Sequence, residues 1–415
     1  MKTKLFSNIF FSIKKIPRIY FLFFYLFFLL VVVSLPYIFN FRRPFFFSMG
    51  SLFCYILIIE VFFRVCYRTG CKRPYVHVPR LPFKEMYIEP HPYLPYVYKK
   101  NFLCQKEMPA TYPLHHEKGY MFAQTMTNNF RHSNGPYGNR DIEVPKPEGL
   151  IRINCLGAST TGNDINYRNK NYSYPMELEK ILMSAFPDLK IEVNNCGQGG
   201  YTSAEILIKF LLDTIDTRPD VVVIYHAYND LGPSLTPGFQ SDYSHAKKNL
   251  GETYYLYRLV SNIPDIPLES WNFLLNYCLF SQNIRFNLMD VISRGAADIK
   301  NDFKGLSTYK RNIEHIINIC KANKIRVVLS TFSQYLYPEI QNNEIYLKYY
   351  EGTKLENNVM RELAAAHNVP LVDNELLIPQ EDRYFVDTVH FTPEGMHIVA
   401  ENISIPIVEY IKNRI

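Results

Sequence analysis

The chain has 415 residues, of which 47% are hydrophobic and 20% charged, so it can form one large domain with attachments and a sizeable core. This composition excludes a wholly disordered chain. The formal net charge of +6 arises at one end, because residues 1–73 hold eleven Lys and Arg residues and one acidic residue, whereas the remainder has 34 basic and 38 acidic residues. No nucleic-acid partner is therefore expected for that remainder.

Residues 1–72 are predicted to form a membrane anchor. Two apolar stretches, at about 19–40 and 44–64, are each long enough to span a bilayer as a helix, and Arg42 and Arg43 separate them. A cleaved signal peptide fits poorly, because its apolar core would be shorter and a small-residue cleavage site should follow. Basic residues flank both stretches, so the side of the membrane on which the rest of the chain lies stays open.

Residues 73–149 are rich in Pro, Tyr and His and show no sustained periodicity. Turn signals such as Asn134-Gly135-Pro136 interrupt them. We expect a linker that folds back on the following domain through a few short strands, with its aromatic side chains packed against that domain.

From Leu150 onward, predicted strands alternate with predicted helices. The strands are expected at Leu150–Leu156, Lys190–Asn194, Asp220–Tyr225, Ile325–Thr331 and Val369–Val372. The helices are expected at Tyr174–Phe186, Ser203–Ile215 with Ser203 as its cap, Lys304–Asn323 and Tyr346–His367, and in a last helix that Thr392 caps and Pro393 begins. This alternation predicts an α/β fold over residues 150–415, an open parallel sheet with helices on both faces in a flavodoxin-like three-layer arrangement.

Residues 232–303 interrupt the alternation and are predicted to form a helical insertion. Long insertions near active sites are often lids, which favours a packed lid over an element that dips into the membrane.

The turn after the first predicted strand carries Ser159 between Gly157 and Gly162. A small hydroxyl residue at a strand-to-helix turn is where a nucleophile can be presented at a sheet edge, and the alternative is a plain turn rich in Ser and Thr. The two glycines have the spacing of a phosphate-binding loop, but Asn163 and Asp164 stand where that loop needs Lys and Ser or Thr. Nucleotide binding is therefore not expected.

Three further polar stretches follow predicted strands or precede the last helix, at residues 195–200, 226–230 and 387–390. Ligands of open α/β sheets bind beyond the carboxyl ends of the strands, where these stretches would meet. Together with the turn at Ser159 they resemble the four blocks of the SGNH, or GDSL-type, hydrolase family, in the same order. The resemblance covers about Leu150–Ile415.

The resemblance implies a role for each matching residue. Ser159 matches the nucleophile, and Asp387 and His390 match the Asp-x-x-His pair. The backbone N–H groups of Ser159 and Gly197 and the side chain of Asn229 match the oxyanion donors. Ala158 and Ala227 depart from the family's usual acid and glycine. The residue types suit acyl transfer, since a serine hydroxyl needs a base, histidine supplies one near neutral pH, and an aspartate orients it.

The expected function is that of a membrane-anchored serine esterase or acylhydrolase that cleaves an acyl ester, such as an O-acetyl ester on a carbohydrate or lipid-linked glycan. The alternatives are an O-acyl transferase in polysaccharide modification, a lipase or thioesterase, and, from a different class, a membrane-tethered binding module. No cofactor or metal is expected, because the eight cysteines include no Cys-x-x-Cys pair and no set with zinc spacing. The expected partners are the acyl-ester substrate, with a glycan or lipid part, and the membrane.

Overall fold

The computed structural model describes residues 88–105, 120–122, 124–132, 140–162, 165–167, 170–249 and 297–414, together with residues 53, 57, 60 and 61. Phe83–Tyr257 and Val291–Ile415 belong to one compact unit. Within these described ranges no helix is both long and apolar enough to cross a bilayer. The predicted span at 19–40 lies outside the described residues, and so does the span at 44–64 except for four positions.

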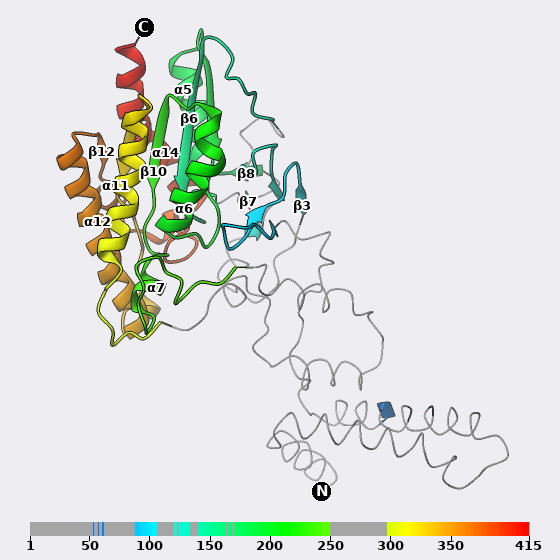
Figure 1. The fold of residues 1–415 in the computed structure, drawn as a ribbon, viewed down its shortest axis with the longest axis vertical. Coiled ribbons are helices and arrows are strands. Elements are labelled where there is room, and N and C mark those ends of the chain that lie inside the picture. The colour runs from blue at the N-terminus through cyan, green and yellow to red at the C-terminus, as the bar shows by residue number, and fades with distance from the viewer. Residues whose placement is uncertain are drawn as a thin grey trace, which may run out of the picture. The chain divides into compact units, whose positions relative to one another are not determined.

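Five parallel strands form the central sheet, in the order β12-β11-β10-β6-β9 (Figure 1). They are β6 (Leu150–Gly157), β9 (Lys190–Asn195), β10 (Val221–Tyr225), β11 (Arg326–Ser330) and β12 (Leu371–Val372). Every residue of β10 is buried, which is typical of a central parallel strand that helices cover on both faces. The register pairs Tyr225 with both Gly157 and Ser330, so the carboxyl ends of the three central strands coincide. The predicted parallel α/β sheet is confirmed.

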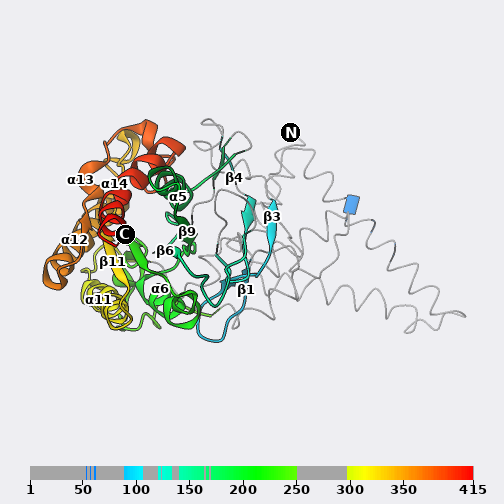
Figure 2. The same ribbon diagram turned by 90° about the horizontal axis from the view of Figure 1, so that it is seen from above.

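Helices cover both faces of this sheet (Figure 2). One face carries α5 (Tyr174–Ala185) and α14 (Pro393–Lys412), and the other carries α6 (Ser203–Lys209) and α11 (Leu306–Ala322), with α12 (Glu344–His367) packed against α11. Apolar side chains such as Leu182 of α5 and Ile403 of α14 are fully buried against the strands. Each such side chain contributes about 1.5–3 kcal/mol to folding.

The second helix differs from its prediction in two ways. Its cap is Thr202, whose backbone N–H and hydroxyl both donate to Glu205 in a capping box, so Ser203 is the first helical residue. The α-helical part ends at Lys209, and a π-helical turn at Phe210–Thr214 and a 3-10 turn at Ile215–Thr217 follow. Ser203 does not act as the cap, because a cap must accept an N–H of the first turn. Its hydroxyl and N–H donate instead to the buried carboxylate of Asp230.

Shorter elements complete the described chain. The segment before the sheet holds β1 (Ile88–Glu89), β2 (Val97–Tyr98), β3 (Leu103–Gln105), β4 (Tyr120–Phe122) and β5 (Gln124–Met126), and β7 (Ile165–Tyr167) and β8 (Lys170–Tyr172) follow β6. The later ones are α7 (Leu231–Leu235), α13 (Asn374–Leu377) and 3-10 turns at Pro338–Ile340 and Asp382–Tyr384. Residues 250–296 of the predicted insertion lie outside the described residues, so its role as a lid stays a prediction.

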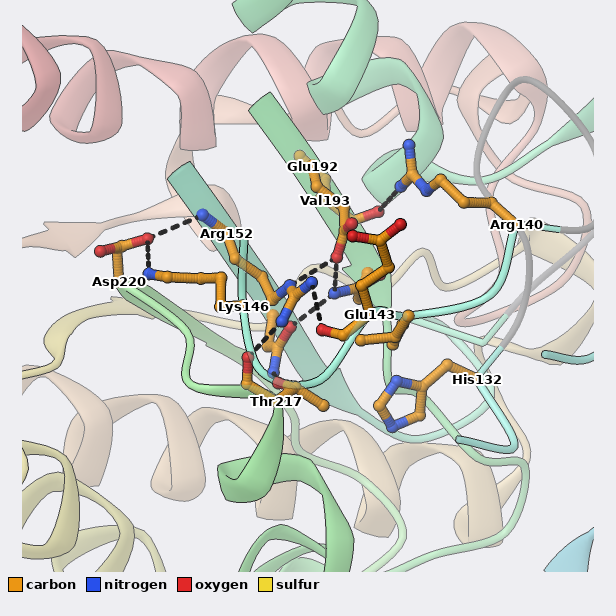
Figure 3. A network of polar contacts seen from close by, with 12 residues as sticks. His132, Arg140, Glu143, Lys146, Arg152, Glu192, Val193, Thr217 and Asp220 are labelled. Carbon is orange, nitrogen blue, oxygen red and sulfur yellow. Dashed lines mark hydrogen bonds and ion pairs between the residues drawn. The ribbon is translucent and has the colours of Figure 1, made fainter. Parts of the chain in front are cut away.

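A polar network fixes the segment before β6 to the sheet (Figure 3). Arg152 of β6 is fully buried, and its Nε donates to Glu192 of β9 at 2.6 Å while Nη2 donates to the carbonyl of Glu143 at 3.1 Å. Asp220 accepts the Arg152 backbone N–H at 2.8 Å and Lys146 Nζ at 2.6 Å. Burial tends to raise the pKa of Asp220, but the bonds from Lys146 and Arg152 lower it overall. Lys146 and the carbonyl of Glu143 therefore attach this segment to the amino-terminal edge of the sheet.

Candidate active site

Ser159 lies in a tight turn at the carboxyl edge of the sheet, directly after β6. The N–H groups of Thr161 and Gly162 both donate to the carbonyl of Ala158, at 3.2 and 2.8 Å. Gly157 has no room for a side chain, because an added Cβ would collide with the carbonyl oxygen of Tyr225 on β10. The glycine lets the turn lie against the neighbouring strand, and this places Ser159 at the strand end.

The structure brings the three predicted catalytic residues together. Oγ of Ser159 lies 3.0 Å from Nε2 of His390, and Nδ1 of His390 lies 2.8 Å from Oδ2 of Asp387. Oδ1 of Asp387 also accepts the backbone N–H groups of Val389 and His390, at 2.9 and 2.8 Å. Because Nδ1 faces a carboxylate, it carries the proton, and Nε2 is left to accept from the serine hydroxyl.

The charge of Asp387 sets the basicity of His390. Burial lowers the pKa of His390, but the negative charge of Asp387 and its hydrogen bond to Nδ1 outweigh burial and raise that pKa above its ordinary value of 6.5. The imidazolium formed when His390 takes a proton is therefore stabilised where it stands.

Gly197 has a different environment from the one predicted for an oxyanion donor. Its N–H donates to Oδ1 of Asn195 at 3.1 Å. An added Cβ would collide with the backbone nitrogen of Gly162, so the glycine allows this loop to lie against the nucleophile turn. Gly200, three residues on, has a φ of +73°. Its N–H, like that of Ser159, donates to no residue in the described part of the chain.

Asn229 follows β10 at the same edge of the sheet. Its Nδ2 donates to the carbonyl of Tyr201 at 2.9 Å, and the second hydrogen of that amide can serve another acceptor. Tyr228 has a φ of +74°, and the hydrogen bond from Asn229 N–H to the Ala227 carbonyl spans it in a γ-turn. Oε2 of Glu356 accepts the Tyr228 N–H at 2.8 Å, which holds this unfavourable backbone conformation in place.

A buried carboxylate supports the loop that carries Asn229. Asp230 is fully buried and accepts the Ser203 N–H at 2.8 Å, Tyr243 Oη at 2.9 Å and His226 Nε2 at 2.8 Å. Burial tends to raise the pKa of Asp230, but the hydrogen bond and charge of His226 and the bonds from Ser203 lower it overall. Sequence reasoning missed this support and that of Glu356, because both carboxylates contact segments far away along the chain.

The described residues include no group of three or more His, Cys, Asp and Glu side chains arranged to hold a metal ion.

The chain shares a family with known enzymes. Residues 155–398, which include the nucleophile turn and the Asp-x-x-His pair, match the GDSL-like lipase/acylhydrolase family. Because this match covers more than half of the sequence, the chain belongs to the GDSL-like lipase/acylhydrolase family and is an ester-hydrolysing enzyme. No match to a curated protein was found.

Three solved structures illustrate the similarity. A lipase/acylhydrolase from Enterococcus faecalis is 20% identical, with a TM-score of 0.37 over 62% of this chain and 95% of its own. A GDSL-like lipase from Bacteroides thetaiotaomicron is 17% identical, with a TM-score of 0.35 over 62% of this chain and 88% of its own. A mutant of an acetyl-xylooligosaccharide esterase from Geobacillus is 16% identical, with a TM-score of 0.37 over 61% of this chain and 91% of its own.

Proposed function

We propose that the chain is a membrane-anchored serine esterase that cleaves acyl esters through Ser159, His390 and Asp387. The observation that carries this proposal is the continuous line of hydrogen bonds from Asp387 through both ring nitrogens of His390 to Ser159. The two bonds, of 2.8 and 3.0 Å, are within the reach that proton transfer needs.

The geometry supports a two-step mechanism. Nε2 of His390 takes the Ser159 proton as Oγ attacks the ester carbonyl carbon, and the carbonyl oxygen becomes the oxyanion of a tetrahedral intermediate. Its collapse breaks the bond to the alcohol oxygen, which leaves with the proton from His390. Water then gives a proton to His390 and attacks the acyl-serine, and a second collapse returns that proton to Ser159 and frees the acid.

The oxyanion needs fixed donors, and three N–H groups are available in the described part of the site. They are the backbone N–H groups of Ser159 and Gly200 and the second hydrogen on Nδ2 of Asn229. Gly200 takes the place expected for Gly197, whose N–H already donates to Asn195.

We assign the substrate as an acyl ester, with an O-acetyl group on a carbohydrate or lipid-linked glycan as the preferred case. The predicted anchor at residues 1–72 supports a substrate at a membrane. Tyrosine rings beside the loop that carries Asn229 support a sugar-bearing one: Tyr228 directly precedes Asn229, and its ring centroid lies 5.0 Å from that of Tyr349. Partly exposed phenol rings offer a flat apolar surface with a polar edge.

The test uses the full-length protein in detergent, with p-nitrophenyl esters of increasing chain length and with acetylated oligosaccharides. We expect hydrolysis that favours acetyl esters, and labelling by a fluorophosphonate probe. Ser159→Ala should lose both, whereas Ser244→Ala, which changes an exposed serine outside the site, should keep both. Equal labelling of Ser159→Ala and the wild type would refute the proposed nucleophile.

A further inference from the structure

We propose that the hairpin of β1 and β2, residues 88–98, contributes to catalysis by holding the oxyanion loop in place, with Tyr98 as a positioning residue. The oxyanion loop is defined here as residues 198–201, which carry Gly200. The inference rests on the proposed function, since it concerns the donor that Gly200 supplies to the oxyanion.

The hairpin bonds to the oxyanion loop at three of its four residues. Oη of Tyr98 accepts the Gly199 N–H at 3.0 Å. The carbonyl of Tyr96 accepts both Nε2 of Gln198, at 3.3 Å, and the phenol hydroxyl of Tyr201. Tyr96 and Tyr98 are both buried, so these bonds form in a packed, water-poor environment.

Tyr98 lies close to the reacting atoms. A Cβ added to Gly199 would be 3.7 Å from Oη of Tyr98 and 3.9 Å from Cβ of Ser159. The phenol oxygen of Tyr98 and the side chain of Ser159 therefore both lie next to Gly199. A shift of that residue changes the geometry of both the loop and the serine turn.

Hydrogen bonds hold the backbone on both sides of the Gly200 N–H. On one side Tyr98 holds the N–H of Gly199, and on the other Nζ of Lys247 donates to the Gly200 carbonyl at 3.1 Å. Two consecutive glycines are the most flexible pair that a backbone can have, so without such bonds the loop would sample other conformations. A donor stabilises the oxyanion best when its position is fixed before the oxyanion forms. The hydroxyl of Tyr98 helps to fix the position of the Gly200 N–H.

The hairpin is also separate in sequence from the enzyme domain. The family match begins at residue 155, and the predicted hydrolase domain at Leu150, more than fifty residues after Tyr98. The segment predicted as a linker thus contributes a side chain that the family match does not include.

The test compares Tyr98→Phe with Tyr93→Phe in the full-length protein. Tyr98→Phe removes only the hydroxyl, and Tyr93 is on the same hairpin but 70% exposed. We expect Tyr98→Phe to lower kcat about fivefold to tenfold, the usual effect of one lost hydrogen bond, with KM changed less than about twofold. Affinity for a boronic acid, which forms a tetrahedral adduct with Ser159, should fall in proportion to kcat/KM. Tyr93→Phe should match the wild type.

The outcomes separate the inference from the proposed function. The concentration of active sites is measured by titration with fluorophosphonate, so that kcat refers to folded enzyme. If kcat and boronic acid affinity of Tyr98→Phe both equal those of the wild type, the inference is wrong. If the wild type hydrolyses no ester, the proposed function fails first. Should Tyr98→Phe not fold, Tyr201→Phe removes the other hydroxyl bonded to the hairpin, and a normal kcat in that variant would equally overturn the inference.

Discussion

Oγ of Ser159 lies 3.0 Å from Nε2 of His390, although 231 positions separate the two residues in the chain. One belongs to the turn after the first strand of the sheet, and the other immediately precedes the last helix. Val386 N–H donates to the His390 carbonyl at 2.8 Å, and Thr392 caps α14 through its hydroxyl, so His390 sits between two hydrogen-bonded turns. These turns fix the place of His390 relative to the start of α14 and hold its ring beside Ser159.

The basicity of His390 predicts the acid side of the pH profile. Asp387 raises the pKa of His390 above 6.5, so the ring is protonated, and unable to accept the serine proton, up to a higher pH than a free histidine. We expect kcat/KM to fall as the pH decreases through that raised pKa. In Asp387→Asn the cause of the rise is gone, so this limb should move to lower pH, and kcat should fall by about 10³–10⁴. The measurement is kcat/KM between pH 4 and 9.

Asp216→Asn provides the matched control for the pH profile, because Asp216 is exposed and lies in the turn before β10. Its profile should overlay that of the wild type. An unmoved acid limb in Asp387→Asn would show that another group controls the profile.

Asn229→Ala should act mainly on the transition state. A donor directed at the oxyanion gains strength as negative charge develops, so its loss lowers kcat more than it raises KM. We expect kcat to fall by about 10²–10³, or about 3–4 kcal/mol, with KM within a few-fold of the wild type. Asn229→Asp should be at least as poor, because a carboxylate would face the oxyanion. Thermal unfolding is measured in parallel, since Asn229 also bonds to Tyr201, and a raised KM with normal kcat would mean that Asn229 positions substrate.

His132 predicts a loss of stability in acid. It is fully buried, with Nδ1 3.6 Å from Sγ of Cys196, and burial together with the charge of Lys209 lowers its pKa to about 3. Between pH 6.5 and 3 the unfolded chain binds a proton that the native chain excludes, so the free energy of unfolding decreases as pH falls, by up to about 1.4 kcal/mol per pH unit.

His132→Gln removes the group that binds this proton. The free energy of unfolding of the variant should therefore depend less steeply on pH between 6 and 4. Urea unfolding at several pH values measures the slope. His315→Gln, at an exposed position on α11, should keep the wild-type slope. Equal slopes in all three proteins would contradict the prediction.

The predicted anchor leads to a fractionation experiment. The full-length chain should stay in the membrane fraction after a carbonate wash, because two spans of about 20 apolar residues insert stably. A chain that begins at Arg73 should be released, and it should still react with fluorophosphonate, because it keeps the hairpin of β1 and β2. Release of the full-length chain by carbonate would count against the anchor.

The sequence allowed the sheet and its helices to be predicted because their signals are local. The β-branched run at Val221–Ile224 and the cap formed by Thr392 and Pro393 identify β10 and the start of α14 without knowledge of any neighbour. Because such signals are local, the predicted ends of the five strands of the central sheet differ from the observed ends by no more than two residues. The π-helical turn at Phe210–Thr214 has no such signal, and the helix was predicted to run through it.

Contacts between distant segments could not be predicted from the sequence. Ser159, Asp387 and His390 were identified through resemblance, and the structure places them within hydrogen-bonding distance. Which glycine presents a free N–H depends instead on the backbone path of the loop, which no residue type in it reveals. The bond from Gly199 to Tyr98 likewise joins positions about a hundred residues apart, in a segment whose composition indicated only packing.

Helix α14 begins three residues after His390 and ends at the amino-terminal edge of the sheet. There Nη1 of Arg414 lies 2.7 Å from Oδ1 of Asp220, the residue that precedes β10, whereas Asn229 follows the same strand at the catalytic edge. A reporter protein fused to the C-terminus is therefore held a full strand length away from Ser159. Such a fusion can test the predicted anchor while substrate still reaches the serine, and the same end is suited to immobilising the active enzyme on a surface.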